Sequence, residues 1–385
     1  MAVTIAEEIM RKVLILFLLI TLNGEIHAQS EEHKQKLYHK DGTYGFIDKE
    51  GNYFLKPKIL QAGSFSEGLA RVEIEKDGKS YYGYINREAE IVIEPKYELA
   101  EDFSQGLAMV GNRITTEDGL LGREIGYINK NGSVVVELKY SEGRKFCEGL
   151  AAVLITSQRR GYRWGFINKE GEIVIETMYA TRVGDFSEGL APVSVEGWWK
   201  WGYINKSGEM VIKPKFDETY GFSEGLARIS VGGEYLRAHD EYIGGKQGFV
   251  NKKGKMVIKP KYEEASDFSE GLAAVNKGKL HAFINKKGKI VKKIKCDSLR
   301  GFSEGLAPIM IKGRWGFIDK NWNVVIKCQF SAVKSFKEGI APVMVGDRLG
   351  YINREGELIV VPKFYVVEHF SEGLGLVRLM FWEER

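Results

Sequence analysis

The most repeated charged side chain in this sequence is a glutamate that precedes glycine in a phrase close to Phe-Ser-Glu-Gly-Leu-Ala. It occurs in eight of nine copies of the phrase and is replaced by Gln105 in the second. A ladder of carboxylates could bind cations, and a carboxylate pair could serve as general acid and base. Acid–base catalysis needs one pair in divergent environments, however, not eight equivalent copies. The repetition therefore predicts turn stabilisation or pairing with recurrent lysines, worth about 0 to 1 kcal/mol per exposed pair.

Other chemistry-bearing residues occur without the spacing that a catalytic or metal site requires. His239-Asp240-Glu241 has metal-capable side chains, but adjacent residues alternate across a strand and no Cys/His spacing accompanies them. No Gly-x-Gly stretch opens a helix after a strand, and no serine stands in a nucleophile elbow. We therefore expect no catalytic residue, no metal and no cofactor, and we predict that the chain is not an enzyme.

Candidate binding residues occur where the repeat pattern is interrupted by longer segments. These insertions all follow the same strand of their units, so they are expected to project from one edge of the molecule. Tyr, Trp and Arg at such an edge suit partner recognition, although tolerated surface insertions are the alternative. The candidate partner-binding residues are Arg159, Tyr162, Trp198, Trp199, Tyr235, Arg237 and His239.

The elements that position these residues come from a ninefold repeat. The Phe of each phrase stands at 65, 103, 146, 186, 222, 268, 302, 336 and 370. A small residue precedes each Phe by 20 positions in eight units and by 21 in the fourth, whereas 14 to 26 positions separate each Phe from the next small residue. Such self-similarity is typical of repeat architectures. One half of the unit is fixed by packing, and the other half carries a loop of variable length.

Each unit reads as short strands. Trp164 to Ile167 is rich in aromatic and β-branched residues, and Asn168 to Gly171 has the composition of a turn. The position of Asn168 is Asn or Asp in all nine units, which predicts a side chain that caps the turn. Ala89 and Trp322 replace the turn glycine in two units, where we expect a strained turn. With three strands per unit and no helical periodicity, the protein should be all-β.

These phrases resemble the bacterial WG-repeat family, whose name comes from a Trp-Gly pair that precedes a short β unit. The pair stands at Trp164-Gly165, Trp201-Gly202 and Trp315-Gly316, and other units vary the first residue. The resemblance covers nearly the whole chain after residue 43. It implies an interaction scaffold without common catalytic residues.

The ends of the chain decide between an open and a closed arrangement. The segment 29–43 would supply a lead-in strand, residues 44–385 would form the nine repeats, and Leu374 to Phe381 would complete the last one. Propeller blades usually have four strands and about 40 residues. We therefore expect an open, curved, solenoid-like array of nine three-stranded β repeats, with a closed ring of the β-propeller type as the alternative.

The first 28 residues resemble a secretory signal peptide, with Met10 as the true start. The apolar run from Val13 to Leu22 is shorter than the roughly 20 residues that cross a bilayer, so no stable membrane span is expected after cleavage, and an uncleaved anchor is the alternative. Three cysteines give no disulfide framework. Cys296 and Cys328 could pair across adjacent units, or they are buried thiols.

We accordingly expect a periplasmic or secreted bacterial scaffold, monomeric, that binds another protein, which could belong to the cell envelope. The alternative is a cell-envelope glycan binder that uses aromatic loop residues. The formal net charge of +4 is spread along the chain, and lysines recur in register, which predicts a solvated face and not a nucleic-acid groove.

Overall fold

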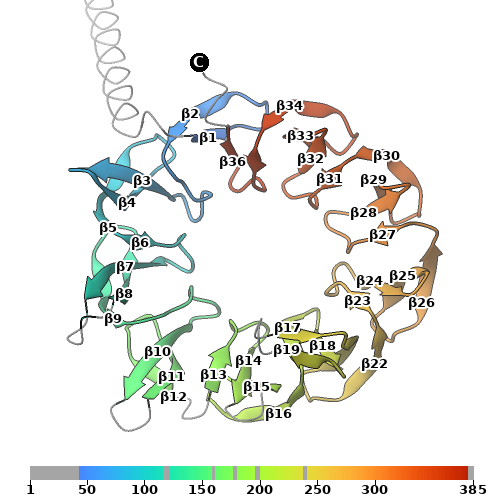
Figure 1. Cartoon of the computed structure of the whole chain (residues 1–385), viewed down its shortest axis with the longest axis horizontal. Coiled ribbons are helices and arrows are strands. Elements are labelled where there is room, and N and C mark those ends of the chain that lie inside the picture. Colours follow the sequence, from blue (N-terminus) through green and yellow to red (C-terminus); the bar gives the residue numbers. More distant parts are fainter. Residues whose placement is uncertain are drawn as a thin grey trace, which may run out of the picture.

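The strands of the computed structural model form nine antiparallel sheets arranged side by side in a ring (Figure 1). The structure describes residues 43–379 except 116–118, 120, 158–160, 177–179, 196–199 and 237–240. Every regular element within these residues is a β-strand, which confirms the all-β prediction. The described part contains no helix with the length and apolar character needed to cross a membrane.

Each sheet is called a blade here, and its strands are given from the inner to the outer side of the ring. Blade 1 consists of β35 (Val366–Val367), β36 (Gly375–Arg378), β1 (Tyr44–Ile47) and β2 (Tyr53–Ile59), and blade 2 of β3 (Ala70–Lys76), β4 (Lys79–Ile85) and β5 (Ile91–Tyr97). Blade 3 consists of β6 (Leu99–Ala100), β7 (Leu107–Thr115), β8 (Leu121–Asn129) and β9 (Val134–Tyr140), and blade 4 of β10 (Ala151–Ser157), β11 (Gly161–Ile167) and β12 (Ile173–Glu176). Blade 5 consists of β13 (Ala180–Val183), β14 (Leu190–Val195), β15 (Trp201–Asn205) and β16 (Met210–Phe216).

Blades 6 to 9 follow the same plan. Blade 6 consists of β17 (Glu218–Ser223), β18 (Leu226–Val231), β21 (Lys246–Asn251) and β22 (Met256–Tyr262), and blade 7 of β23 (Glu264–Ala265), β24 (Leu272–Lys277), β25 (Leu280–Asn285) and β26 (Ile290–Ile294). Blade 8 consists of β27 (Ser298–Leu299), β28 (Leu306–Ile311), β29 (Arg314–Asp319) and β30 (Val324–Phe330), and blade 9 of β31 (Ala332–Val333), β32 (Ala341–Val345), β33 (Arg348–Ile352) and β34 (Leu358–Phe364). A separate hairpin of β19 (Glu234–Leu236) and β20 (Glu241–Ile243) is inserted between β18 and β21.

Blade 1 joins the two ends of the described chain and closes the ring. Strand β36 pairs with β1 from Tyr44↔Arg378 to Ile47↔Gly375, and the Leu379 backbone N–H donates to the Thr43 carbonyl at 2.9 Å. The expected open array is therefore wrong, and the closed ring, the alternative, is correct. The physical reason is that an open end would leave the inner edge of β1 unpaired.

One sequence expectation about the ends is corrected by this pairing. The segment after Leu374 is expected to complete the last repeat, but β36 supplies an inner strand of the first blade. The lead-in strand expected within 29–43 stays a prediction, because all of that segment except Thr43 lies outside the described residues.

The expectation of three strands per repeat is also wrong. Seven blades have four strands, and in blades 2 and 4 the fourth is reduced to the single bridges Ala62↔Val72 and Gly143↔Val153. The additional strand is the innermost one and is as short as two residues, as in β6. A segment of that length produces no hydrophobic alternation that the sequence could reveal.

An aromatic pair lies between each two neighbouring blades. The Phe or Tyr that follows the small anchor residue contacts the Phe of the next phrase along the chain, with ring centroids 4.7 to 5.1 Å apart. The nine pairs are Phe46–Phe65, Tyr84–Phe103, Tyr127–Phe146, Phe166–Phe186, Tyr203–Phe222, Phe249–Phe268, Phe283–Phe302, Phe317–Phe336 and Tyr351–Phe370. Such pairs contribute roughly 0.5 to 1.5 kcal/mol beyond their buried area. This contact explains why the anchor-to-Phe spacing is nearly constant.

In seven blades a bulge in the outer strand explains the small anchor residue. In blade 5, β15 pairs with β16 at Trp201↔Phe216 and Tyr203↔Ile212, so two extra residues of β16 curve over the glycine between them. A Cβ on Gly202 would lie 2.3 Å from the Ile212 carbonyl oxygen. Blade 7 has Ala282 at this position, and β26 there pairs in register from His281↔Ile294 to Phe283↔Lys292, without that bulge.

Candidate functional site

The recurrent Asn and Asp side chains are all used inside the turns that follow them. Asn205 Oδ1, for example, accepts hydrogen bonds from the backbone N–H groups of Ser207 at 3.1 Å and Glu209 at 2.9 Å. The capping prediction is thereby confirmed for the Asn and Asp positions of all nine units. Ala89 and Trp322 adopt φ values of 64° and 71°, as expected for a strained turn.

The recurrent glutamates form a belt of hydrogen bonds between successive blades. Each has a positive φ between 49° and 57°, as does Gln105, and each side chain accepts a hydrogen bond from the phrase glycine N–H of the next blade. The nine acceptor–donor pairs are Glu67–Gly106, Gln105–Gly149, Glu148–Gly189, Glu188–Gly225, Glu224–Gly271, Glu270–Gly305, Glu304–Gly339, Glu338–Gly373 and Glu372–Gly68. We call this the glutamate belt. The bond from Gly68 to Glu372, 3.0 Å long, closes it across the chain ends.

Basic residues of the same neighbouring blade reinforce the glutamate belt. Seven ion pairs of 2.8 to 3.8 Å join them, namely Lys49–Glu338, Lys130–Glu67, Lys206–Glu148, Lys252–Glu188, Lys286–Glu224, Lys320–Glu270 and Arg354–Glu304. Partial burial would raise the pKa of Glu188, but its bonds to Lys252 and to the backbone outweigh burial and lower it. These carboxylates are engaged in structure, so the turn-stabilising interpretation is confirmed.

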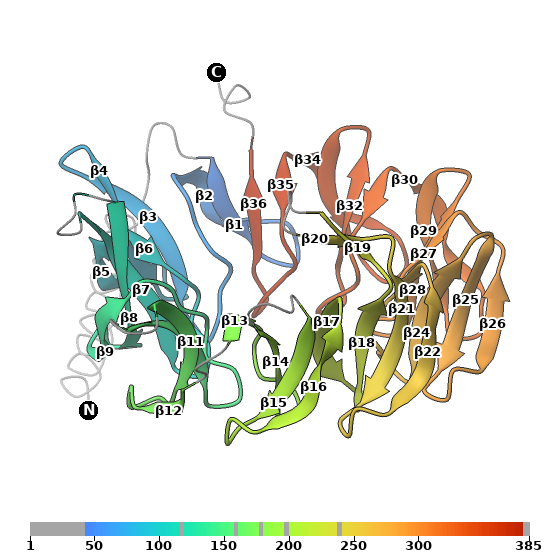
Figure 2. The same cartoon turned by 60° about the horizontal axis from the view of Figure 1, so that its bottom comes forward.

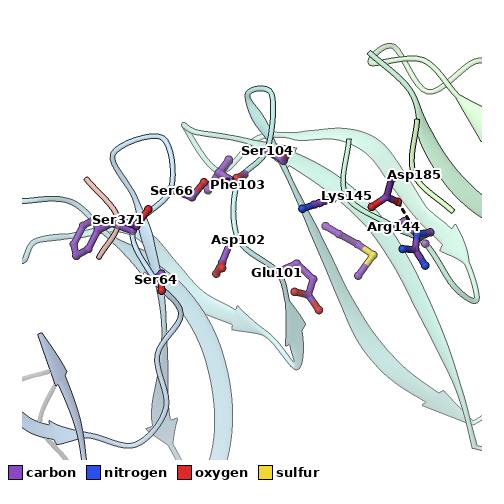
Figure 3. A pocket seen from close by; sticks show the side chains of 13 residues that line it. Ser64, Ser66, Glu101, Asp102, Phe103, Ser104, Arg144, Lys145, Asp185 and Ser371 are labelled. Atoms are coloured by element: carbon purple, nitrogen blue, oxygen red, sulfur yellow. Dashed lines mark hydrogen bonds and ion pairs between the residues drawn. The ribbon is translucent and has the colours of Figure 1, made fainter. Parts of the chain in front are cut away.

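A cavity of about 630 Å³ opens on the inner side of blades 1 to 5 (Figure 3). Its walls come from the short loops that carry the repeated phrases. The lining residues are Ser64, Phe65, Ser66, Glu101, Asp102, Phe103, Ser104, Met109, Gly143, Arg144, Lys145, Asp185 and Ser371. A second cavity of about 470 Å³ shares Glu101, Met109 and Gly143 with it. We call the two together the inner groove.

Charges of both signs line the inner groove. Arg144 Nε lies 2.6 Å from Asp185 Oδ1 and joins blade 4 to blade 5, and Arg71 Nε lies 3.0 Å from Asp102 Oδ1. Burial lowers the pKa of Arg71, but the Asp102 carboxylate outweighs this effect and raises it.

Two further charged side chains of the groove are available to a ligand. Glu101 and Lys145 are exposed, and neither forms an ion pair with another residue of the described part. They lie between Asp102 on one side and the Arg144–Asp185 pair on the other (Figure 3). Such a surface can receive a polar partner that presents both charge signs.

The inner groove was not predicted from the sequence. Four of its charged residues stand just before the phrase Phe, where charge and size vary from unit to unit. Glu101-Asp102 and Arg144-Lys145 stand at this position in consecutive units. That local departure from the repeat was the available signal.

The predicted partner-binding residues are only partly within the described structure. Tyr162 lies on β11 and is 61% exposed. Tyr235 lies on β19 opposite Tyr242 of β20. Arg159, Trp198, Trp199, Arg237 and His239 lie outside the described residues.

The connections that contain these candidates are nonetheless related by the fold. They link β10 with β11, β14 with β15, and β18 with β21, which are equivalent strand pairs of blades 4, 5 and 6. The long hairpin of β7 and β8 occupies the same place in blade 3. The strand ends that these connections join therefore lie on one face of the ring (Figure 2).

Cysteines and metal-capable groups show no assembled site in the part of the chain that is described. Cys147, Cys296 and Cys328 are free thiols, and burial raises the pKa of Cys296 to about 11. No three His, Cys, Asp or Glu side chains among the described residues lie close enough together to hold a metal ion.

The strand pairing defines a β-propeller with nine blades, closed by strands from both ends of the chain. The family model described as "WG containing repeat" matches residues 44–79, 82–112, 125–156, 164–199, 201–235, 248–280, 282–315, 315–348 and 350–379. The chain belongs to this family, as the repeated phrases indicated.

Three solved structures resemble this chain distantly. No curated protein matches the chain. An uncharacterized protein from Listeria monocytogenes EGD-e is 10% identical, with 78% of this chain and 92% of that chain covered and a TM-score of 0.38. The β-propeller domain of the Trilobed protease from Pyrococcus furiosus, described as having an open velcro topology, is 11% identical, with 69% and 97% covered and a TM-score of 0.36.

The extracellular domain of a hybrid two component system from B. thetaiotaomicron is 10% identical, with a TM-score of 0.30. The match covers 82% of this chain, which spans about half (51%) of that structure. All three TM-scores lie below 0.5, so the propeller assignment follows from the strand pairing of this chain itself.

Proposed function

We propose that this propeller is a non-catalytic scaffold, exported to the periplasm or the medium, that binds a protein partner at the inner groove. The supporting observation is that the repeated polar side chains are bonded within the ring, whereas two charged side chains of the inner groove are exposed. The repeated Glu and Asn residues are bonded within the ring, whereas Glu101 and Lys145 stand exposed in a cavity. Many equivalent units distribute surface over the molecule and do not concentrate reactivity.

The test is affinity capture from the native envelope with the full chain, followed by measurement of the dissociation constant for the captured, purified partner. Replacing both charges, Glu101→Gln and Lys145→Gln, leaves the net charge unchanged and should weaken binding at least tenfold. The matched control is Glu137→Gln with Lys139→Gln on β9, two exposed residues on the outer side of blade 3. Equal weakening by both pairs, or by neither, would refute the inner groove as the binding site.

The loop-bearing face is tested with the same partner. A chain whose fifth insertion, between β18 and β21, is shortened to 14-residue spacing should lose affinity if that face contributes to recognition. Unchanged binding would remove the loop candidates Arg237 and His239 from the proposal.

A second candidate function, binding of a cell-envelope glycan, comes from the aromatic residues of the insertions, of which Tyr162 is exposed in the structure. Sugars stack on such rings. Glycan-array or peptidoglycan binding that disappears in the Trp198→Ala/Trp199→Ala variant would favour it, and absence of any glycan binding would reject it.

Export is tested separately. If residues 1–28 are removed on secretion, N-terminal sequencing of the extracytoplasmic protein should begin at Gln29. A chain that retains these residues would contradict the signal-peptide proposal.

A further inference from the structure

The positive charge of the chain is concentrated in one arc of the ring. Residues 246–327 contain 19 Lys and Arg against 7 Asp and Glu, a net charge of +12, so that all other residues together carry −8 to give the total of +4. This stretch runs from β21 in blade 6 to β30 in blade 8. The expectation that the positive charge is spread along the chain is therefore wrong, because residues 246–327 carry a net charge of +12 and the remainder of the chain is net negative.

The outer strands of the blades show the same charge asymmetry at the rim of the ring. Five positions after the turn, β22 and β26 have Lys259 and Lys293. The equivalent positions of β5, β9 and β12 have Glu94, Glu137 and Glu176. Strand β26 lies on the side of the ring opposite β5 and β9 (Figure 1). The molecule thus has one basic and one more acidic rim.

The lysines of the basic rim are free to meet an external anion. Lys255, Lys259, Lys289 and Lys293 are exposed and form no ion pair with any residue of the described part. By contrast, Lys252 and Lys286 of the same blades are held by the glutamate belt. The basic rim therefore adds charge that the fold itself does not neutralise.

Apolar side chains are interleaved with these lysines. Met256 and Val257 on β22 are 38% and 36% exposed, and Ile290 and Val291 on β26 are 37% and 46% exposed. A polyanion such as nucleic acid or an acidic polysaccharide would leave these side chains in water, whereas the interfacial region of a bilayer accepts them.

The composition also favours a diffuse anionic surface over a folded protein. The basic residues of 246–327 are 17 Lys and only 2 Arg. Lysine is depleted in protein interfaces and arginine enriched, while clusters of lysine near apolar side chains are typical of attraction to anionic lipids.

We propose that the outer rim of blades 6 and 7 docks the ring edge-on to an anionic lipid bilayer. The lysines beside β22 and β26 contact lipid phosphates, and the flanking Met, Val and Ile side chains enter the interfacial layer. The acidic rim of blades 2 to 4 faces away, because anionic lipids repel it. Protein binding at the inner groove is a separate matter that this docking neither requires nor excludes.

The test measures partition of the full chain onto vesicles of phosphatidylglycerol and phosphatidylcholine, with pure phosphatidylcholine as the uncharged reference. Binding should appear only with phosphatidylglycerol and should fall as salt rises. Changing Lys255, Lys259, Lys289 and Lys293 to Gln should lower it several hundredfold, at about fivefold per lysine. The matched control removes the same charge from other outer strands, with Lys56, Lys58, Lys96 and Lys139 changed to Gln, and should change binding less than twofold.

Residues 1–42 are common to all variants, so their contribution cancels in these comparisons. Equal loss in both quadruple variants, or no binding to phosphatidylglycerol, would overturn the proposal. The apolar contribution is tested with Val257→Ser/Val291→Ser, which should weaken vesicle binding about tenfold or more at equal charge. Unchanged vesicle binding by this variant, together with equally tight binding of the parent chain to dextran sulfate or duplex DNA, would identify a general polyanion site and reject the bilayer.

Discussion

At the scale of single residues, Gln105 is the one neutral side chain of the glutamate belt, and a substitution there tests the belt directly. Gln105 Oε1 accepts a hydrogen bond from the Gly149 N–H at 2.7 Å, but its neutral side chain offers no charge to Lys169, the basic residue at the equivalent position of blade 4. Gln105→Glu should raise the free energy of unfolding by a few tenths to about 1 kcal/mol at low salt.

Urea unfolding measures this gain, and the double variant with Lys169→Gln provides the control. The gain should shrink in that background and in high salt. A gain of the same size with and without Lys169 would show that the ion pair does not form.

His369 is the second residue-scale test. Its Nδ1 is buried and has no hydrogen-bond partner among the residues that the structure describes. Burial lowers the pKa of His369, and the nearby Lys334 and Lys337 lower it further, while Glu368 acts in the opposite direction. The unfolded chain therefore binds the proton more readily, and stability should fall as the pH drops below about 6.5.

The measurement is the urea midpoint between pH 7.5 and 5. His369→Gln should flatten this dependence. An identical slope in the variant would mean that another group titrates there.

At the scale of the strand pair, the bulge over the anchor glycine explains why seven blades require glycine there. Gly202→Ala would place a methyl group against the Ile212 carbonyl and should cost about 1 to 3 kcal/mol. Gly316→Ala should cost about the same, because its Cβ would lie 2.4 Å from the Ile326 carbonyl.

Thermal unfolding of both variants measures this cost. Ala282 of blade 7 is the natural control, because β26 lacks the bulge there and alanine is accommodated. Wild-type stability of Gly202→Ala would show that the bulge relaxes freely.

At the scale of the whole molecule, ring closure should make the protein one cooperative unit. Truncation after residue 365 removes β35 and β36, including Val377, which is fully buried in the core of blade 1. The truncated chain should lose cooperative unfolding or aggregate, since the inner edge of β1 becomes exposed.

A circular permutant provides the control for truncation. It joins residue 379 to residue 43, which are already hydrogen-bonded, and opens the chain at the turn of Lys312-Gly313. This permutant should unfold cooperatively within a few degrees of the parent. A truncated chain with the parent's midpoint and cooperativity would instead indicate an array that needs no closure.

Local features of the fold could be predicted from residues that act on their near neighbours. The Asn turn caps and the strained turns at Ala89 and Trp322 involve partners only a few residues away, so the repeated pattern contained them. The inner strands could not be predicted, because two residues such as Leu99-Ala100 form a strand only when a neighbour supplies the edge.

The inner groove, too, could be predicted from the sequence only in part. Variation before the phrase Phe is visible in the sequence, but the cavity that joins Ser371 to Arg144 depends on the C-terminal strands β35 and β36 belonging to blade 1.

The sequence by itself determined the all-β class, the ninefold repeat and the family, because each follows from short-range patterns repeated along the chain. Only the tertiary structure decided that the array closes, since β1 and β36 are separated by more than 300 residues and no local pattern specifies their pairing. Closure also turned a linear excess of lysine into one basic arc facing a more acidic one. The physical reason is that backbone pairing and charge position depend on distance in space, which the sequence encodes only through the complete fold.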